Sequence, residues 1–231
     1  MENTEYNLIY FSTNEAITLK CNCRVSFWSG PVVTNFGSET SPVTITDIYG
    51  NPNVWNVTIY MHGGKVANTL PEKLIKRLNV IGDYFDLHIT NLSNSDQGLY
   101  ICDLKEFCLI KEKRYLLQQK LLPEKIEIEN VTHDNTVIGI ENYALNLVCF
   151  VESGKPPAVL TWRRNGTIIK QGGSRKLRYS FIPKKTDHQS VYICEVQNQD
   201  MEKPLTKQIH LSIKCKIIIC MLHVSKRPYS K

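Results

Sequence analysis

Cysteine is the residue type in this sequence that is best placed to do chemistry. The chain of 231 residues has 8 cysteines, among which Cys21 and Cys23 form one close pair and Cys102 and Cys108 another. Four thiolates could hold a zinc ion, but zinc-binding cysteine pairs usually have two to four intervening residues, and these have one and five. An even number of cysteines in a β-rich chain favours disulfides formed in an oxidising compartment. We therefore expect disulfides and no metal site.

No other residues have the spacing of a catalytic site. The 6 histidines are scattered without a His-x-x-x-His pair, and Gly-x-Ser-x-Gly and phosphate-binding glycine loops are absent from the sequence. Aromatic residues fall on core positions and do not interleave with basic residues, which disfavours nucleic-acid binding. We expect a protein that is not an enzyme, uses no cofactor and binds neither nucleic acid nor a small-molecule substrate.

Composition and length indicate a folded protein of two domains. The chain is 42% hydrophobic and 22% charged, and its length suits two units of about 100 residues each. The polar N-terminus does not read as a signal peptide, and no run of 18 apolar residues could span a bilayer. Cysteines typical of disulfide formation conflict with the lack of a recognisable signal peptide, because disulfides form in secreted proteins. We resolve the conflict by expecting a fragment, or an imperfect gene model, of a secreted or surface protein.

Alternating apolar residues predict strands throughout the first half of the chain. Ile17, Leu19, Cys21 and Cys23 alternate with polar or small residues, so they share one face of a strand. Trp28 follows soon after, on the next strand. Further strands are expected near residues 43–46, 54–60, 84–89, 98–102 and 109–120, with a turn at 50–52.

The second half begins after Leu122, where Pro123 interrupts the preceding strand. Asn165-Gly166 predicts a two-residue hairpin turn. Strands are expected near residues 145–151, 160–164, 177–181, 192–196 and 206–214. We therefore predict domains at 1–122 and 123–214, followed by a basic, disordered tail at 215–231 whose Cys215 and Cys220 lie outside both domain cores.

The two halves repeat one motif, and the motif carries a family resemblance. Tyr100-Ile101-Cys102, preceded by Asp96 and Gly98, returns as Tyr192-Ile193-Cys194, and each copy follows its own upstream Cys and Trp. In these residues the chain resembles the immunoglobulin superfamily over nearly all of residues 5–214. The first half resembles a variable-type domain. The second resembles the C2-type domains of the nectin and nephrin group, through Leu147-x-Cys149, residues 154–157, residues 161–166 and residues 187–194.

This resemblance implies an all-β fold of two tandem immunoglobulin-like Greek-key β-sandwiches. It implies core disulfides Cys21–Cys102 and Cys149–Cys194, each worth roughly 4 kcal/mol on the chain-entropy model. It also implies core residues Trp28, Tyr100, Trp162 and Tyr192. Trp28 comes only 7 positions after Cys21, closer than usual, so Trp55 remains an alternative core tryptophan. The shared strand parity of Cys21 and Cys23, with a connection of five residues from Cys102 to Cys108, predicts a further Cys23–Cys108 bond.

Two groups of polar residues have competing interpretations. Asn-x-Ser/Thr triplets predict glycosylation at Asn56, Asn91, Asn130 and Asn165, although Asn165 also suits its turn. A basic cluster could bind an anionic surface, but we favour solvated strand faces on two opposite sheets. Its members are Arg163, Arg164, Lys170, Arg175, Lys176 and Arg178.

The family resemblance implies an extracellular recognition or adhesion module of a surface receptor, which binds a protein partner through its variable-type domain. The alternatives are structural spacer domains in a longer extracellular array, or a secreted soluble protein. Homophilic and heterophilic binding both remain open. We expect a cell-surface or secreted location, with membrane attachment through a segment outside this chain. The expected contact residues lie outward on the sheet, with Phe27 and Ile101 as an exposed apolar patch, joined by Asp103, Leu109 and Lys111.

Overall fold

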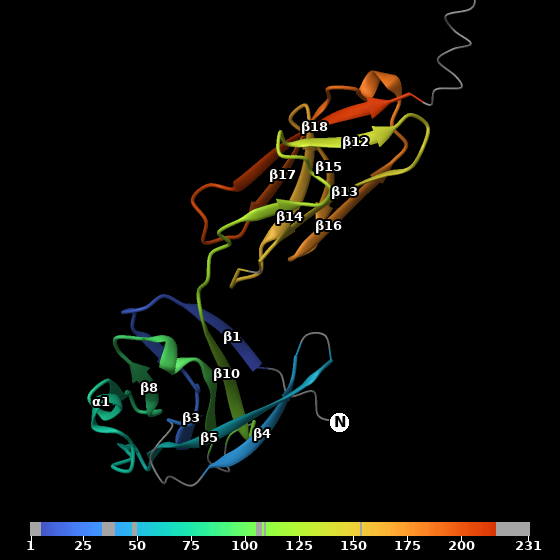
Figure 1. The fold of residues 1–231 in the computed structure, drawn as a ribbon. Helices are drawn as coiled ribbons and strands as arrows, with labels where there is room; N and C mark the ends of the chain where they lie inside the picture. Colours follow the sequence, from blue (N-terminus) through green and yellow to red (C-terminus); the bar gives the residue numbers. More distant parts are fainter. Residues whose placement is uncertain are drawn as a thin grey trace, which may run out of the picture. The chain divides into compact units, whose positions relative to one another are not determined.

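The computed structural model describes residues 6–33, 40–47, 50–104, 108, 110–152 and 154–215. The chain divides into two compact units, Met1–Lys120 (unit 1) and Leu121–Lys231 (unit 2), which are built almost entirely from strands (Figure 1). The division follows Lys120, whereas the sequence places the junction after Leu122. Leu121 falls in unit 2 because its backbone pairs with that of Lys155. In the part of the chain that is described, no helix is both long and apolar enough to cross a membrane.

The described residues of unit 1 form strands, one short helix and one 3-10 turn. In chain order these are β1 (Tyr6–Phe11), β2 (Ile17–Leu19), β3 (Val25–Pro31), β4 (Ser41–Thr46), β5 (Pro52–His62), β6 (Lys65–Val66), α1 (Glu72–Ile75), β7 (Leu78–Ile81), β8 (Asp86–Ile89), η1 (Asn94–Asp96), β9 (Gly98–Leu104) and β10 (Glu112–Gln119).

Two sheets enclose the core of unit 1. The larger sheet has the order β1-β10-β9-β3-β5-β4, with β6 beside β5, and the smaller has the order β2-β8-β7. Successive side chains of a strand point to opposite faces of its sheet. Trp28, Tyr100 and Leu87 face the space between the two sheets and are fully buried. Trp28 is therefore the core tryptophan. Trp55 is only half-buried and packs in a separate apolar cluster.

The hairpin of β4 and β5 forms an arm on unit 1. β5 is 11 residues long; its C-terminal half pairs with β3, and its N-terminal part, residues 52–57, pairs with β4. We call β4 together with residues 52–57 the arm. In Figure 1 the arm crosses β10 at a steep angle. The apolar residues on one side of the arm pack onto the outer face of β9 and β10, in a cluster of Ile45, Val57, Leu99, Ile101 and Leu116, with Tyr6, Val43 and Trp55 at its edge.

Unit 2 is a simpler sandwich. Its elements are β11 (Ile126–Ile128), β12 (Thr136–Ile140), β13 (Leu145–Val151), β14 (Val159–Arg164), β15 (Thr167–Gly172), β16 (Lys176–Phe181), η2 (Lys185–Asp187), β17 (Val191–Gln197) and β18 (Leu205–Lys214). A sheet of order β11-β13-β16 faces one of order β12-β18-β17-β14-β15.

The sequence signals of unit 2 correspond to observed structure. Trp162, Tyr192 and Cys194 are fully buried between its sheets. Asn165 and Gly166 join β14 to β15 with φ angles of 49° and 77°, the positive values that a two-residue hairpin turn of type I′ requires. Cys215 follows β18 and is disulfide-bonded, but not to Cys149 or Cys194, which are bonded to each other. Cys220 lies outside the described residues.

Candidate recognition face of unit 1

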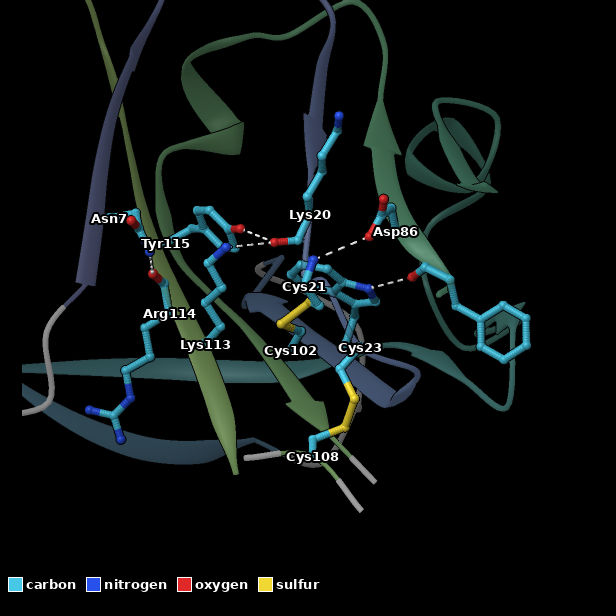
Figure 2. Close-up of a disulfide and its surroundings, with 12 residues drawn as sticks. Asn7, Lys20, Cys21, Cys23, Asp86, Cys102, Cys108, Lys113, Arg114 and Tyr115 are labelled. Carbon is cyan, nitrogen blue, oxygen red and sulfur yellow. Dashed lines mark hydrogen bonds between the residues drawn. A yellow bond between two sulfur atoms is a disulfide. The ribbon is translucent and has the colours of Figure 1, made fainter. Parts of the chain in front are cut away.

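Three disulfides fix the strands, and they join the pairs that the sequence predicts. Figure 2 shows the two of unit 1, a buried core bond and a half-buried bond further out. The Cα separations are 6.5 Å for Cys21–Cys102, 6.3 Å for Cys23–Cys108 and 6.3 Å for Cys149–Cys194. The outer bond ties the segment between β2 and β3 to the connection between β9 and β10. It therefore holds Cys108 close to Cys23.

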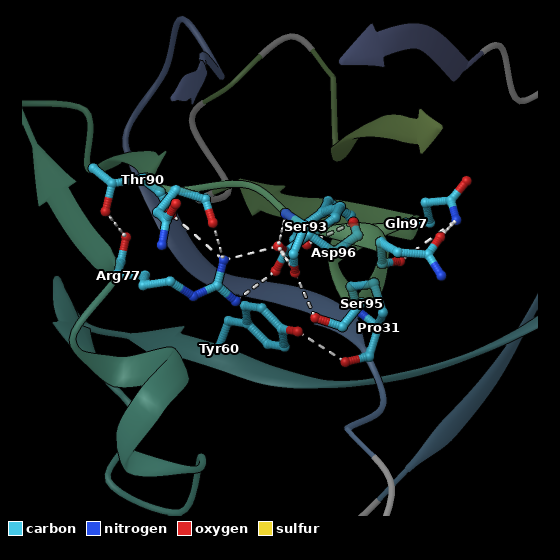
Figure 3. Close-up of polar contacts among 11 residues, drawn as sticks. Pro31, Tyr60, Arg77, Thr90, Ser93, Ser95, Asp96 and Gln97 are labelled. Carbon is cyan, nitrogen blue, oxygen red and sulfur yellow. Dashed lines mark hydrogen bonds and ion pairs between the residues drawn. The ribbon is translucent and has the colours of Figure 1, made fainter. Parts of the chain in front are cut away.

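A buried ion pair anchors the turn before β9 (Figure 3). Arg77 donates to both carboxylate oxygens of Asp96 at 2.8 Å, and the hydrogen bond to Asp96 raises the pKa of Arg77. Asp96 also accepts the backbone N–H of Ser93 at 2.7 Å, while the Tyr100 hydroxyl donates to the Asp96 carbonyl at 3.1 Å. These bonds orient the start of β9, and so they set which of its side chains face outward.

Unit 2 has a similar ion pair before β17, but its arginine comes from a different position in the fold. Arg164, on β14, donates to Asp187 at 2.7 Å, to Ser190 at 2.9 Å and to the Tyr192 hydroxyl at 3.1 Å. Burial raises the pKa of Asp187, but hydrogen bonds from the Lys184 backbone and from Arg164 outweigh it, so the net shift is downward. The pair fixes the turn before β17 as Arg77 and Asp96 fix the one before β9.

One row of outward side chains crosses four strands of unit 1. Phe27 on β3 stands opposite His62 on β5 and Asp103 on β9, and Asp103 stands opposite Glu112 on β10. Residues directly opposite in antiparallel strands lie on the same face of a sheet. We call these four residues the open row. His62 is exposed and the other three are half-buried.

The next rows of the same face lie beneath the arm. Ile101 is two residues from Asp103 on β9, and it stands opposite Arg114 on β10. Only 6% of Ile101 is exposed, because the arm packs Ile45 and Val57 over this part of the sheet. The arm therefore divides the face into a covered apolar part and the open row.

At the border between the covered part and the open row, some charged groups have partners and others do not. Arg114 pairs with Glu112 at 2.5 Å, whereas Asp103 makes no ion pair with a described residue. Burial raises the pKa of Asp103, and the negative charge of Glu112 raises it further. The Nε and Nη1 groups of Arg114 are buried and have no acceptor among the described residues, nor has the Trp55 indole N–H. The described residues thus leave one carboxyl group and several donors without partners.

A protein family and two solved structures are similar to this chain. The family described as immunoglobulin domain matches residues 130–213. The solved structure of Rst D1-D2 is 17% identical with a TM-score of 0.50, and the alignment covers 91% of this chain and 97% of that one. The ectodomain Ig1–Ig3 of mouse nectin-like molecule 4 is 17% identical, with a TM-score of 0.41 and coverage of 90% and 67%. No curated protein matches the sequence.

The match in residues 130–213 and the likeness to Rst D1-D2, which spans both units, decide the fold. The chain is a tandem of two immunoglobulin-like domains. At 17% identity the likeness to Rst D1-D2 shows the fold alone. The three disulfides are those of a protein that folds in an oxidising environment.

One prediction about the recognition face of unit 1 is wrong. Ile101 does not form an exposed patch with Phe27, because it belongs to the apolar cluster under the arm. Phe27 itself is half-buried. The alternation of β9 correctly places Ile101 on the outer face, but strand parity does not reveal that a hairpin 50 residues earlier folds over that face.

Of the remaining predicted contact residues, Asp103 lies in the open row. Lys111 is exposed just before β10, where its carbonyl accepts the N–H of the core residue Leu104, so it stands opposite Leu104 and outside the row. Leu109 lies outside the described residues. His62, Glu112 and the exposed Ile59, which stands opposite Ser29, were not predicted from the sequence. They are placed by the register of β3 with β5 and of β9 with β10, which only the structure shows.

All four predicted glycosylation asparagines are exposed. Asn56 lies on the arm, and its alternation with the inward Trp55 and Val57 puts it on the side facing away from the covered cluster. Asn91, Asn130 and Asn165 adopt positive φ angles between 49° and 57° in turns. Glycosylation at these positions remains a prediction.

The predicted basic cluster does not form one surface. Arg163 and Arg164 lie on β14 and Lys170 on β15, in the five-stranded sheet, while Lys176 and Arg178 lie on β16 in the opposite sheet. Arg163 is also paired with Glu195 at 2.9 Å, and Lys176 with Glu129 at 2.6 Å. Among the residues that the structure describes, no group of three or more His, Cys, Asp or Glu side chains could hold a metal ion.

Proposed function

We propose that this chain is the recognition part of an extracellular surface protein and that it binds a protein partner through the open row of unit 1. The observation that carries the proposal is the division of the outer face by the arm. The arm buries the apolar rows and leaves one row that combines Phe27 with Asp103, Glu112 and His62. An apolar residue surrounded by charge matches the composition of small protein interfaces.

The fold supports this proposal, because tandem immunoglobulin-like domains with disulfide cores suit the extracellular environment. The exposed Ile59 lies beside the open row on the same face, where it stands opposite Ser29. The side of the arm that carries Asn56 is a poor alternative surface, because a glycan there would obstruct it.

The test is a binding screen of the tetramerised chain against an array of purified cell-surface ectodomains, with the chain itself included. Phe27→Ser combined with Asp103→Lys should weaken binding to any partner by at least tenfold, since central interface residues commonly contribute more than 1 kcal/mol each. Val54→Lys on the arm and Ile138→Lys on unit 2 are matched controls at exposed apolar positions.

Retention of the three disulfides and of the thermal transition shows that a variant is folded. Loss of binding with the Ile138 variant, and full binding with the Phe27 and Asp103 variant, would assign recognition to unit 2. Failure of the screen to find any partner, with a folded tetramer, would favour the spacer function.

A further inference from the structure

Unit 2 contains a hollow of about 390 Å³ that the recognition face does not use. It lies between the segment at the start of the unit and the end of β13, and all of its walls belong to unit 2. Its volume falls within the range of small-ligand sites. The lining residues are Leu121, Leu122, Glu124, Lys125, Glu127, Phe150, Val151 and Glu152.

Fixed backbone contacts hold this hollow open. Leu121 and Lys155 exchange two backbone hydrogen bonds of 2.8 and 2.7 Å at one end, and Ile126 pairs with Val151 at the other. Between these points Pro123 is buried against Gly154. A Cβ on Gly154 would lie 2.8 Å from Pro123 Cδ, so only glycine admits this close approach. The intervening chain is therefore held away from β13 by packing on both sides.

The lining combines apolar surface with an excess of negative charge. Phe150 and the exposed Leu121 and Leu122 supply the apolar part. Of the three carboxylates, Glu127 is paired with Lys125, which raises the pKa of Lys125 and lowers that of Glu127. Glu124 and Glu152 form no ion pair with any residue that the structure describes, although the charge of Glu152 also contributes to the raised pKa of Lys125. Two carboxylates without a direct ion pair thus lie beside an apolar wall.

We propose that this hollow binds the side chain of an arginine from a protein partner. The methylene stem of arginine packs on Phe150 and Leu122, and its planar guanidinium donates to Glu124 and Glu152. Carboxylates bind guanidinium groups through two parallel hydrogen bonds, which lysine cannot form. This site is separate from the open row, so it does not depend on the proposed function.

The test uses the full chain labelled with ¹⁵N and titrated with N-butylguanidinium, which reproduces the arginine side chain. We expect saturable amide shifts at Leu121, Lys125 and Phe150, with a dissociation constant in the millimolar range. The neutral isostere N-butylurea should bind at least tenfold more weakly. A tripeptide Leu-Arg-Leu should bind more tightly than free N-butylguanidinium, and its citrulline analogue should not.

The variant Glu124→Gln with Glu152→Gln should weaken N-butylguanidinium binding at least fivefold. Glu129→Gln, which removes a carboxylate outside the hollow, should leave it unchanged. Equal binding of N-butylurea, shifts that map elsewhere on a folded protein, or full binding by the double variant would overturn the proposal. If N-butylguanidinium binds but the tripeptide does not, the hollow accepts a small organic cation and the assignment to a protein side chain is wrong.

Discussion

Asp103 is expected to lower the stability of unit 1 while it contributes to the proposed binding of a partner. Its carboxylate is half-buried and stands directly opposite Glu112, and like charges in that position destabilise a sheet. Its folded-state pKa is raised, so the charged form costs stability that is regained as the pH falls. Residues kept at such a cost are commonly functional.

We therefore predict that Asp103→Asn stabilises unit 1 at pH 7 and weakens partner binding. A carboxyl with a raised folded-state pKa contributes stability that is complete below its unfolded pKa of about 3.9 and is lost as the pH rises through the folded value. The melting temperature of the variant should exceed that of the wild type at pH 7, and the two should converge near pH 3. Equal melting temperatures at pH 7 would contradict the electrostatic account of this row.

Ile101 gives a second prediction, which concerns the covered cluster. Its side chain is buried by the arm, so Ile101→Ala should destabilise unit 1 by about 2–4 kcal/mol through lost packing. Val54→Ala, on the other side of the arm with 66% of its surface exposed, should change stability by less than about 0.5 kcal/mol. Denaturant unfolding measures both. A change below 0.5 kcal/mol at Ile101 would mean that the arm does not cover the sheet in solution.

At the scale of the structural elements, the outer disulfide ties Cys108, between β9 and β10, to Cys23, between β2 and β3. Cys23–Cys108 is half-buried, whereas Cys21, Cys102, Cys149 and Cys194 are at most 2% exposed. With Cys21–Cys102 in place, the outer bond closes only a short additional loop. Its chain-entropy contribution is therefore about 2–3 kcal/mol, less than an isolated bond of the same span would give.

We predict that mild reduction opens Cys23–Cys108 before the two core bonds. Brief treatment with a dithiol under native conditions, followed by alkylation and peptide mapping, should label Cys23 and Cys108 before Cys21, Cys102, Cys149 and Cys194. The double variant Cys23→Ser with Cys108→Ser should remain folded and lose about 2–3 kcal/mol of unfolding free energy. Labelling of a core pair at the same rate would show that the core bonds are equally accessible.

The arm is also the element that limits prediction from sequence. The repeat of Tyr-x-Cys with its upstream Cys and Trp fixes strand identity, because each residue type has one place in this sandwich. Alternation then assigns Trp28, Tyr100 and Trp162 to the cores, as observed. The covering of Leu99, Ile101 and Leu116 depends on how far β5 extends and twists beyond its pairing with β3. That is a long-range property, which neither periodicity nor spacing contains.

At the scale of the whole molecule, the chain has two independent cores and two separate candidate sites. Unit 1 carries the open row, and unit 2 carries a hollow built by Pro123 and Gly154. The sequence predicted both sandwiches and the face that holds the row. It did not predict the hollow, whose walls come from two segments about 30 positions apart in the sequence, which meet through the backbone pairings of Leu121 with Lys155 and of Ile126 with Val151.

The most direct test of the account is to locate the partner on unit 1 by photo-crosslinking. A photoreactive phenylalanine analogue replaces Lys111, which is exposed and adjacent in sequence to Glu112 of the open row, or Val54, which is exposed on the far side of the arm. After binding to the ectodomain found in the screen, the Lys111 position should form a crosslink and the Val54 position should not. A crosslink from Val54 with none from Lys111, in folded and binding-competent protein, would contradict recognition through the open row.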